Sequence, residues 1–461
     1  MPDSFIENIY YKLPYSLQNI AVSLYGLKLK KDRYSARFSD HLEFLKESEW
    51  KSREQIETYQ NEKITQLIHH AYHIVPFYKK WYDEHGVNIS QIKTVDDLQK
   101  LPVLTKEMVK KNQEELISNK FEKASLKKQL TSGTTGTPLT IYQTKESLNL
   151  QWAVFWRFRE RFGVKYNDRQ LMFGARLPIS QNQQNPPYWR HDYFNNRVYL
   201  STSHISQKTV HDIVDYLNST YFVFFTGYPS AMVNLANLMR ENDLKLLNPP
   251  KIIFSASDAL LKNHKTIIRD VFGAPVTEFY GNVEFAGTMS KCKHGRFHVD
   301  YEHCHIESQK LDDSENQELI LTSWGNEAMP FIRYRIGDYG IPLHSECECG
   351  RKSDTFSGID GRTEDYVVTP DGRKLIGMNQ VFEYAENALE IQLFQKEKEE
   401  IIFRIVPGKN FGEKDKESLI REFRRRAGDE MTIRFDLVDS IEKSSSGKFR
   451  AVISEIDDSQ V

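Results

Sequence analysis

A run of small hydroxyl residues and glycines, TSGTTGTP, occupies residues 131–138. Its glycines let the backbone turn and approach a ligand closely. Its hydroxyls can donate to phosphate oxygens, and successive backbone N–H groups can form a nest for an anion. The run is not a Walker loop, because the Lys-Ser/Thr ending is absent, and taken alone an ordinary surface turn fits it about as well. The candidate phosphate-binding residues are Ser132, Gly133, Thr134, Thr135 and Gly136.

Two acidic residues stand in short motifs further along the chain. Glu284 ends the segment YGNVE, which begins with Tyr280 and Gly281 directly after an apolar run. A carboxylate at the C-terminal edge of a parallel strand lies where α/β sheets bind ligands, and it can hold Mg2+ against a phosphate. Asp338 ends the segment YRIGD and can accept hydrogen bonds from ribose hydroxyls. Taken singly, a solvated glutamate and a β-turn aspartate explain these two residues better.

Two basic residues lie in motifs near the C-terminus. Arg362 lies in GRTED at residues 361–365, and Lys448 lies in SSSGKFR at residues 444–450. A lysine on a Gly/Ser loop can reach into a site as a mobile positive charge. Taken singly, a linker and a solvated basic tail account for the two motifs.

The cysteines and histidines offer a metal site rather than a disulfide framework. Four cysteines in 461 residues without an export signal point to the reducing cytosol. Cys292-x5-His298 and Cys347-x-Cys349 would give three thiolates and one imidazole, which suits structural Zn2+. The Cys-x-Cys spacing is tighter than the common Cys-x2-Cys, and spacing alone favours unligated thiols. Two further residues could substitute as ligands, His294 and Cys304.

The elements that must position these residues follow an α/β pattern. Short apolar runs at residues 222–225, 252–254 and 276–280 are separated by helical segments, which predicts a parallel sheet buried on both faces. The composition changes near Gly361 and Arg362. Beyond this point the expected elements are strands at 366–368, 401–406 and 431–437 and a helix at 419–426. We therefore expect a large N-terminal α/β domain, residues 1–361, and a small C-terminal α+β domain, residues 362–461.

Composition excludes several classes of protein. The formal net charge of −2 and the pI near 6.7 do not mark the whole chain as a binder of nucleic acid or of anionic membranes. No stretch approaches the ~20 consecutive apolar residues of a membrane helix, and the first residues do not resemble a signal peptide. Residues 13–29 are mildly apolar and predict a packed N-terminal helix, with peripheral membrane contact as the alternative. A cytoplasmic location is expected.

The order and approximate spacing of the motifs resemble the adenylate-forming superfamily of acyl-CoA synthetases. Within it, the chain looks most like the branch of phenylacetate-CoA ligases and CapK-type polysaccharide biosynthesis proteins. The resemblance covers nearly the full length and implies a large adenylation domain followed by a small mobile domain. The segments that resemble the CapK-type pattern are residues 13–29, VPFY at 75–78, LPVLTK at 101–106 and GKFRAV at 447–452.

The resemblance also implies roles for single residues. The Ser/Thr/Gly loop would hold the β- and γ-phosphates of ATP, Glu284 would ligate Mg2+ and Asp338 would bind the ribose. Thr137, Val283 and Ile336 replace residues that are frequent in the family, which leaves the efficiency of ATP use open. The remaining assignments are Ser255, Ser257 and Asp258 in the adenine pocket, Arg362 near the ribose and phosphate, Glu364 at the hinge and Lys448 as the catalytic lysine. Related ligases carry a similar Cys/His arrangement, which supports zinc.

The activity implied is that of an AMP-forming acid ligase. A small carboxylic acid would react with ATP to give acyl-AMP and pyrophosphate, and the acyl group would pass to CoA. The rival acceptor is the amine of an amino sugar or amino acid in capsule or O-antigen assembly, because TPDGR at residues 369–373 favours the CapK type. A catalytically silent nucleotide-binding scaffold is the rival from another class. No nucleic acid partner and no integral membrane segment are expected, and a homodimer is left open.

Overall fold

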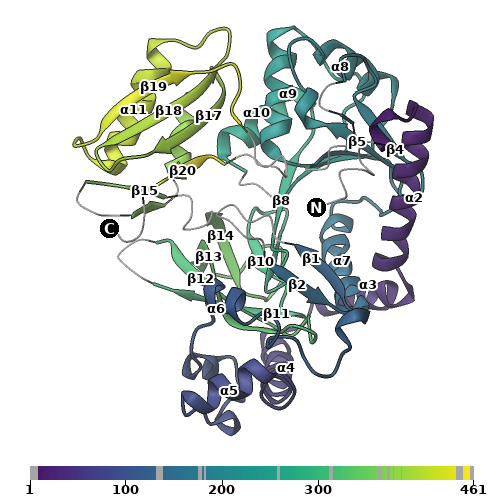
Figure 1. Cartoon of the computed structure of the whole chain (residues 1–461), viewed down its shortest axis with the longest axis vertical. Coiled ribbons are helices and arrows are strands. Elements are labelled where there is room, and N and C mark those ends of the chain that lie inside the picture. The colour runs from purple at the N-terminus through teal and green to yellow at the C-terminus, as the bar shows by residue number, and fades with distance from the viewer. Residues whose placement is uncertain are drawn as a thin grey trace. The chain divides into compact units, whose positions relative to one another are not determined.

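The computed structural model describes residues 9–130, 139–174, 179–180, 183–256, 260–310, 315–360, 366–370, 374–376, 378–385, 387–442 and 450–456. The chain divides into two compact units (Figure 1). The first unit comprises Met1–Lys28, Tyr166–Glu278 and Gly361–Val461, and the second comprises Leu29–Lys165 and Phe279–Asp360.

The first unit contains the parallel sheet that the apolar runs predicted. Its strands follow the order β4-β5-β3-β6-β7-β8. Neighbouring strands are parallel except for β4, which pairs antiparallel with β5 at the edge. The strands β6 and β7 are buried along their whole length, as a sheet covered on both faces requires. The strands are β3 (Gln170–Gly174), β4 (Trp189–Asp192), β5 (Arg197–Ser201), β6 (Phe224–Gly227), β7 (Ile252–Ser255) and β8 (Val276–Gly281), and the helices between them are α8 (Val210–Ser219), α9 (Pro229–Glu241) and α10 (Lys262–Phe272).

The C-terminal part of the first unit has the expected α+β composition. A four-stranded sheet of order β19-β18-β17-β20 packs with α11 around its own apolar cluster. All three strands and the helix predicted there are confirmed. The predicted domain boundary falls within residues 361–365, outside the described residues, and stays a prediction. The elements are β15 (Tyr366–Val368), β16 (Lys374–Ile376), β17 (Ala388–Gln395), β18 (Glu400–Pro407), α11 (Glu413–Ala427), β19 (Thr432–Leu437) and β20 (Val452–Ser454).

The second unit combines helices with an antiparallel sheet of order β11-β12-β13-β14-β10-β9. The last part of β8 pairs antiparallel with β9. Side-chain caps fix the helix starts: Ser52 forms a capping box with Gln55, and Thr144 accepts from the Ser147 amide. The elements are α3 (Ala36–Ser48), α4 (Arg53–Ile74), α5 (Pro76–Glu84), α6 (Lys106–Lys111), β1 (Lys127–Leu130), β2 (Thr140–Gln143), α7 (Lys145–Glu160), β9 (Thr288–Lys291), β10 (Phe297–Val299), β11 (Cys304–Gln309), β12 (Gln317–Ser323), β13 (Phe331–Leu343) and β14 (Thr355–Asp360).

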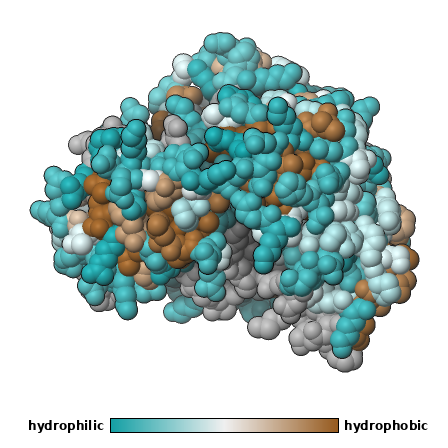
Figure 2. All heavy atoms as spheres, turned by 90° about the horizontal axis from the view of Figure 1, so that it is seen from above, coloured by the Kyte–Doolittle hydropathy of each residue, from teal (hydrophilic) through white to brown (hydrophobic). Residues whose placement is uncertain are grey.

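The helix α2 (Tyr15–Arg33) begins in the first unit and ends in the second. Among the described residues, no helix has the length and apolar character that crossing a bilayer requires. Most of the surface seen in Figure 2 is hydrophilic, with separate brown patches. Single exposed apolar side chains are common on proteins, so only several of them on one surface indicate an interaction site.

Candidate functional site

The turn that follows β8 holds Glu284 in a buried position. The side chain of Asn282 spans this turn, since its Oδ1 accepts from the Ala286 amide and its Nδ2 donates to the Gly287 carbonyl, both at 2.9 Å. Glu284 is only 3% exposed, and the hydroxyl of Tyr334 donates to its Oε1 over 3.5 Å. A buried carboxylate is costly unless a positive or donating group balances it. The Tyr334 hydroxyl is one such donor, and a carboxylate held in this turn is also of the type that ligates divalent cations.

The ring of Phe285, in the same turn, stacks on the ring of His303. Phe285 has a φ of +53°, a backbone conformation that bulky residues rarely adopt. Its ring stacks on His303 at a centroid distance of 4.2 Å. The Nε2 atom of His303 lies 2.7 Å from the Thr288 hydroxyl, which donates to Asp300 over 2.7 Å. Burial lowers the pKa of His303 to about 3, so this ring is neutral and acts in packing and hydrogen bonding.

Asp300, which accepts from Thr288, also belongs to a buried ion-pair network. Arg157 on α7 donates to Asp300 over 2.7 Å and contacts Glu302 through both terminal nitrogens. All three side chains are at most 2% exposed, and the Ser48 hydroxyl also donates to Glu302 over 2.6 Å. Removing one partner of such a network leaves a buried charge without compensation. The network thus ties α3 and α7 to the segment that supports Glu284.

Tyr280 and Asp338 form a direct hydrogen bond. The Tyr280 hydroxyl donates to the Asp338 carboxylate over 2.7 Å, although the two residues are 58 positions apart. The register explains this meeting: Glu318 on β12 faces Tyr339, whereas Ile320 faces Arg335, so residues 336–338 bulge out of β13. Such bulges redirect side chains beside functional sites. The structure therefore brings two of the predicted motifs together within the second unit.

Two further predicted residues end strands of the central sheet. Ser255 ends β7 in the first unit, where its hydroxyl is buried without a hydrogen-bond partner among the described residues. Gly281 ends β8, and a Cβ added there would lie 2.8 Å from the Phe279 ring, so the position suits glycine. The predicted residues that lie outside the described ranges are Ser132, Gly133, Thr134, Thr135, Gly136, Ser257, Asp258, Arg362, Glu364 and Lys448.

The predicted Cys/His set converges in the second unit. One ligand atom from each of four residues lies within 4.8 Å of all the others. The two sulfurs of Cys292 and Cys347 are 3.7 Å apart, and the Cys349 sulfur is 3.3 Å from the His298 Nε2. Zn–S bonds of about 2.3 Å at a tetrahedral ion give sulfur separations of roughly 3.8 Å. The sulfur separation is far beyond the roughly 2.05 Å of a disulfide. The set therefore has the dimensions of a tetrahedral Cys3His site.

Two tight turns present the thiols. The amide of Gly295 donates to the carbonyl of Cys292, and the amide of Gly350 donates to that of Cys347, both over 3.0 Å. Gly295 and Gly350 have φ values of +84° and +86°, which glycine adopts without strain. A glycine three positions after a cysteine in both motifs is the sequence signal of these turns, and the prediction from ligand spacing did not use it.

The electrostatics of His298 and Cys349 suit metal ligands, whereas burial raises the pKa of the Cys347 thiol to about 11. Burial, with the nearby guanidinium groups of Arg351 and Arg161, lowers the pKa of His298 to about 3, so the ring is neutral and can ligate. Burial alone raises the pKa of the Cys349 thiol, but hydrogen bonds from Arg351 outweigh it and lower that pKa. The substitutes considered from sequence are not among the four converging residues: His294 pairs with Glu348 at 3.2 Å, and the Cys304 thiol contacts the Asp300 carbonyl.

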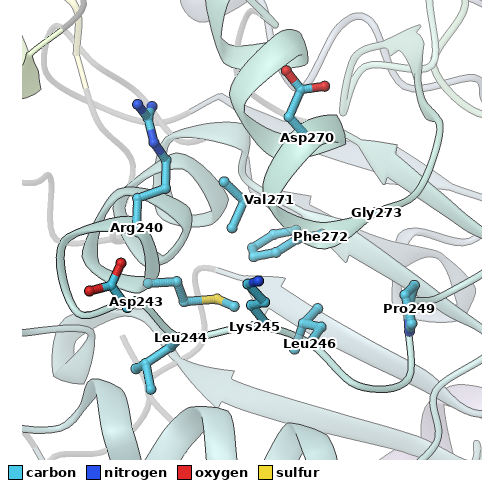
Figure 3. Close-up of a pocket in the computed structure, with 11 residues that line it drawn as sticks. Arg240, Asp243, Leu244, Lys245, Leu246, Pro249, Asp270, Val271, Phe272 and Gly273 are labelled. Atoms are coloured by element: carbon cyan, nitrogen blue, oxygen red, sulfur yellow. The ribbon is translucent and has the colours of Figure 1, made fainter.

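A surface hollow of about 440 Å³ lies in the first unit, between the C-terminal ends of α9 and α10 (Figure 3). Leu246, Val271 and Phe272 lie toward its centre, and Arg240 and Asp270 stand at its rim. These apolar residues belong to, or pack against, the core of the first unit. No predicted site residue lines this hollow, so we interpret it as an open edge of that core.

The sequence is similar to one family model and to several curated proteins. Residues 367–455 match the family model described as the CapK C-terminal domain. Protein CapK from Staphylococcus aureus is 24% identical over 460 residues, covering 98% of this chain and 100% of CapK. The phenylacetate-coenzyme A ligase of Thermus thermophilus is 23% identical over 337 residues, covering 68% of this chain and 72% of that ligase. The chain is a homologue of CapK and of the phenylacetate-coenzyme A ligases.

Solved structures agree on the fold. A 2-hydroxyisobutyryl-CoA ligase in the postadenylation state matches with a TM-score of 0.69 and 16% identity, covering 88% of this chain and 91% of that ligase. An acyl acid amido synthetase in complex with 2,4-DB matches with a TM-score of 0.55 and 13% identity, covering 86% and 89% of the two chains. The predicted mixed α/β fold of the adenylate-forming enzymes is confirmed.

Proposed function

We propose that this CapK homologue activates a carboxylic acid with ATP, forms an acyl-AMP and releases pyrophosphate, and then transfers the acyl group to CoA. The observation that carries the proposal is the hydrogen bond that joins Asp338 to Tyr280, a residue of the same YGNVE segment as the buried Glu284. It lies in a chain homologous to phenylacetate-coenzyme A ligases with the fold of a CoA ligase that binds an acyl adenylate. Fold alone does not define a reaction, so the residues of the site matter here.

Each residue of this group supplies a different part of the chemistry. Attack of a carboxylate on the α-phosphate brings two anions together, and bound Mg2+ would offset that charge. Glu284 would hold the ion, because its carboxylate is fixed and buried at the turn after β8. Asp338, oriented by Tyr280, would accept hydrogen bonds from the ribose hydroxyls. Lys448 would stabilise the developing negative charge, and the loop at residues 131–138 would hold the departing phosphates.

A panel of carboxylic acids tests the proposal. Pyrophosphate release is measured with each acid, first without an acceptor and then with CoA, and the thioester is detected by mass spectrometry. We expect ATP-dependent and Mg2+-dependent pyrophosphate release with at least one acid, followed by a CoA thioester. Nucleotide binding without pyrophosphate release from any acid would favour the silent scaffold instead.

A second acceptor follows from a different observation. The match to CapK spans 98% of the chain, whereas the match to the CoA ligase of Thermus spans 68%. An acyl acid amido synthetase also shares the fold. We therefore keep amide formation on an amino sugar or amino acid, in polysaccharide assembly, as the second candidate. The same panel with amines in place of CoA separates the two, because the product is then an amide and no thioester forms.

We also propose a structural zinc ion at the Cys/His set. The four ligand atoms lie within 4.8 Å of one another, and three thiolates with one imidazole would form a closed structural site without an open position. The ion would cross-link the turn after β9 to the turn after β13. This zinc would stabilise the second unit and would take no part in the reaction.

Replacing Cys347 with serine is expected to abolish zinc binding and to lower the melting temperature. Losing a few kcal/mol of metal-linked stability corresponds to a decrease of roughly 5–10 °C for a unit of this size. Elemental analysis of the untagged protein and thermal unfolding measure the two effects. His294→Gln is the matched control, because this exposed imidazole lies outside the set. Wild-type protein without zinc, or equal loss in the control, would exclude the site.

A further inference from the structure

The helix α2 packs with its polar side inward. Its buried residues are Gln18, Asn19, Ser23 and Gly26. These residues face the edge strand β4, where the Asn19 Oδ1 accepts from the His191 amide over 2.9 Å and the Ser23 hydroxyl donates to the His191 carbonyl over 3.3 Å. An edge strand presents unpaired backbone groups that need polar partners. The polar residues of α2 therefore satisfy the edge of the sheet.

The opposite side of α2 is apolar and exposed. Leu17, Ile20 and Leu24 are 46%, 51% and 57% exposed in the described part of the chain. Their spacing places them on one stripe of the helix, which we name the α2 outer face. In Figure 2 brown atoms gather at the right-hand edge, on the side where Figure 1 draws α2. A surface helix normally turns its apolar residues toward the core, whereas α2 leaves these three exposed.

The surroundings of the α2 outer face are basic and aromatic. Lys12 precedes the helix and Lys28 and Lys31 lie in its C-terminal half, all three exposed, and no acidic residue occurs between Tyr15 and Lys31. On the helix itself, Tyr15 and Tyr25 are 36% and 50% exposed. Aliphatic residues flanked by lysine and tyrosine are typical of helices that lie in a membrane interface.

We propose that the α2 outer face binds the surface of an anionic lipid bilayer. Leu17, Ile20 and Leu24 would enter the boundary between headgroups and acyl chains, and the lysines would meet anionic headgroups. A second copy of this chain fits less well. A two-fold interface places the same surface patch on both subunits, so lysines would face lysines without acidic partners on the helix. The inference is independent of the proposed reaction, because α2 carries none of the candidate site residues.

Vesicle flotation tests the proposal with the full-length protein. We expect binding to vesicles of phosphatidylcholine with phosphatidylglycerol, weaker binding at high salt, and little binding to phosphatidylcholine alone. The triple variant Leu17→Ser, Ile20→Ser, Leu24→Ser should lose at least about tenfold in vesicle affinity. Replacing Lys28 and Lys31 with glutamine should cost about fivefold for each charge removed.

Leu247→Ser is the matched control, because Leu247 is 74% exposed on another surface of the first unit. It should bind vesicles like the wild type. Unchanged melting temperatures would show that all the variants fold, as expected for exposed positions. The proposal is overturned if the wild type does not bind the anionic vesicles, or if the triple variant binds them equally well. It is also overturned if the α2 outer face instead causes concentration-dependent dimerisation in light scattering, with no vesicle binding.

Discussion

A Glu284→Gln protein is expected to lose pyrophosphate release by about a hundredfold or more. The substitution keeps the size of the side chain and its oxygen acceptor, so the turn held by Asn282 should remain intact. It removes the negative charge that would hold Mg2+ beside the phosphates. The loss should therefore appear in the rate of acyl-AMP formation, and the Mg2+ concentration needed for half-maximal activity should rise.

The control for this prediction is Glu348→Gln. Glu348 has an 85% exposed side chain and should keep wild-type pyrophosphate release and Mg2+ dependence. Thermal unfolding of both variants separates a catalytic effect from a folding defect. Full activity of Glu284→Gln at wild-type Mg2+ concentrations would remove Glu284 from the metal site.

Much of the sheet in the first unit could be predicted from local patterns. Continuous apolar runs bounded by turn residues became β6, β7 and β8; β6 and β7 are buried on both faces, which needs mostly apolar residues, whereas β8 is fully buried only at its start. The small α+β part could be predicted from a different pattern, because β18 alternates between buried and partly exposed residues, as a strand with one covered face does. Local patterns also gave a helix at α2, but not its orientation. The orientation depends on the edge strand β4, whose backbone groups bond to the polar side of α2. That strand lies next to α2 only in the folded protein, so no local pattern indicates it.

Only part of the candidate site could be predicted. Tyr280 and Asp338 were expected as separate motifs, and their hydrogen bond depends on a bulge in β13 that has no local sequence pattern. Arg157 and Asp300 were missed altogether, since 143 positions separate them and a buried ion pair gives no periodic signal. The thiols of the Cys/His set did converge, because two glycine-containing turns carry them.

A Lys448→Ala protein is expected to lose acyl-AMP formation by about a hundredfold or more while it keeps acyl transfer from a supplied acyl-AMP. In the adenylate-forming enzymes that this chain resembles, the small domain rotates between the two half-reactions, so the lysine would serve only the first. Loss of a charge that acts only in the adenylation transition state should reduce the rate of that step and leave the second step unchanged.

Measuring the two half-reactions separately makes this prediction specific. Pyrophosphate release with ATP and the acid reports the first half-reaction, and product formation from synthetic acyl-AMP and the acceptor reports the second. Lys443→Ala, in the same C-terminal segment, controls for a general effect of removing a lysine there and should leave both rates unchanged. A folding defect would reduce both half-reactions together, whereas a catalytic role for Lys448 reduces one. Wild-type pyrophosphate release from Lys448→Ala would therefore remove this lysine from the chemistry, and the C-terminal domain would then need another role.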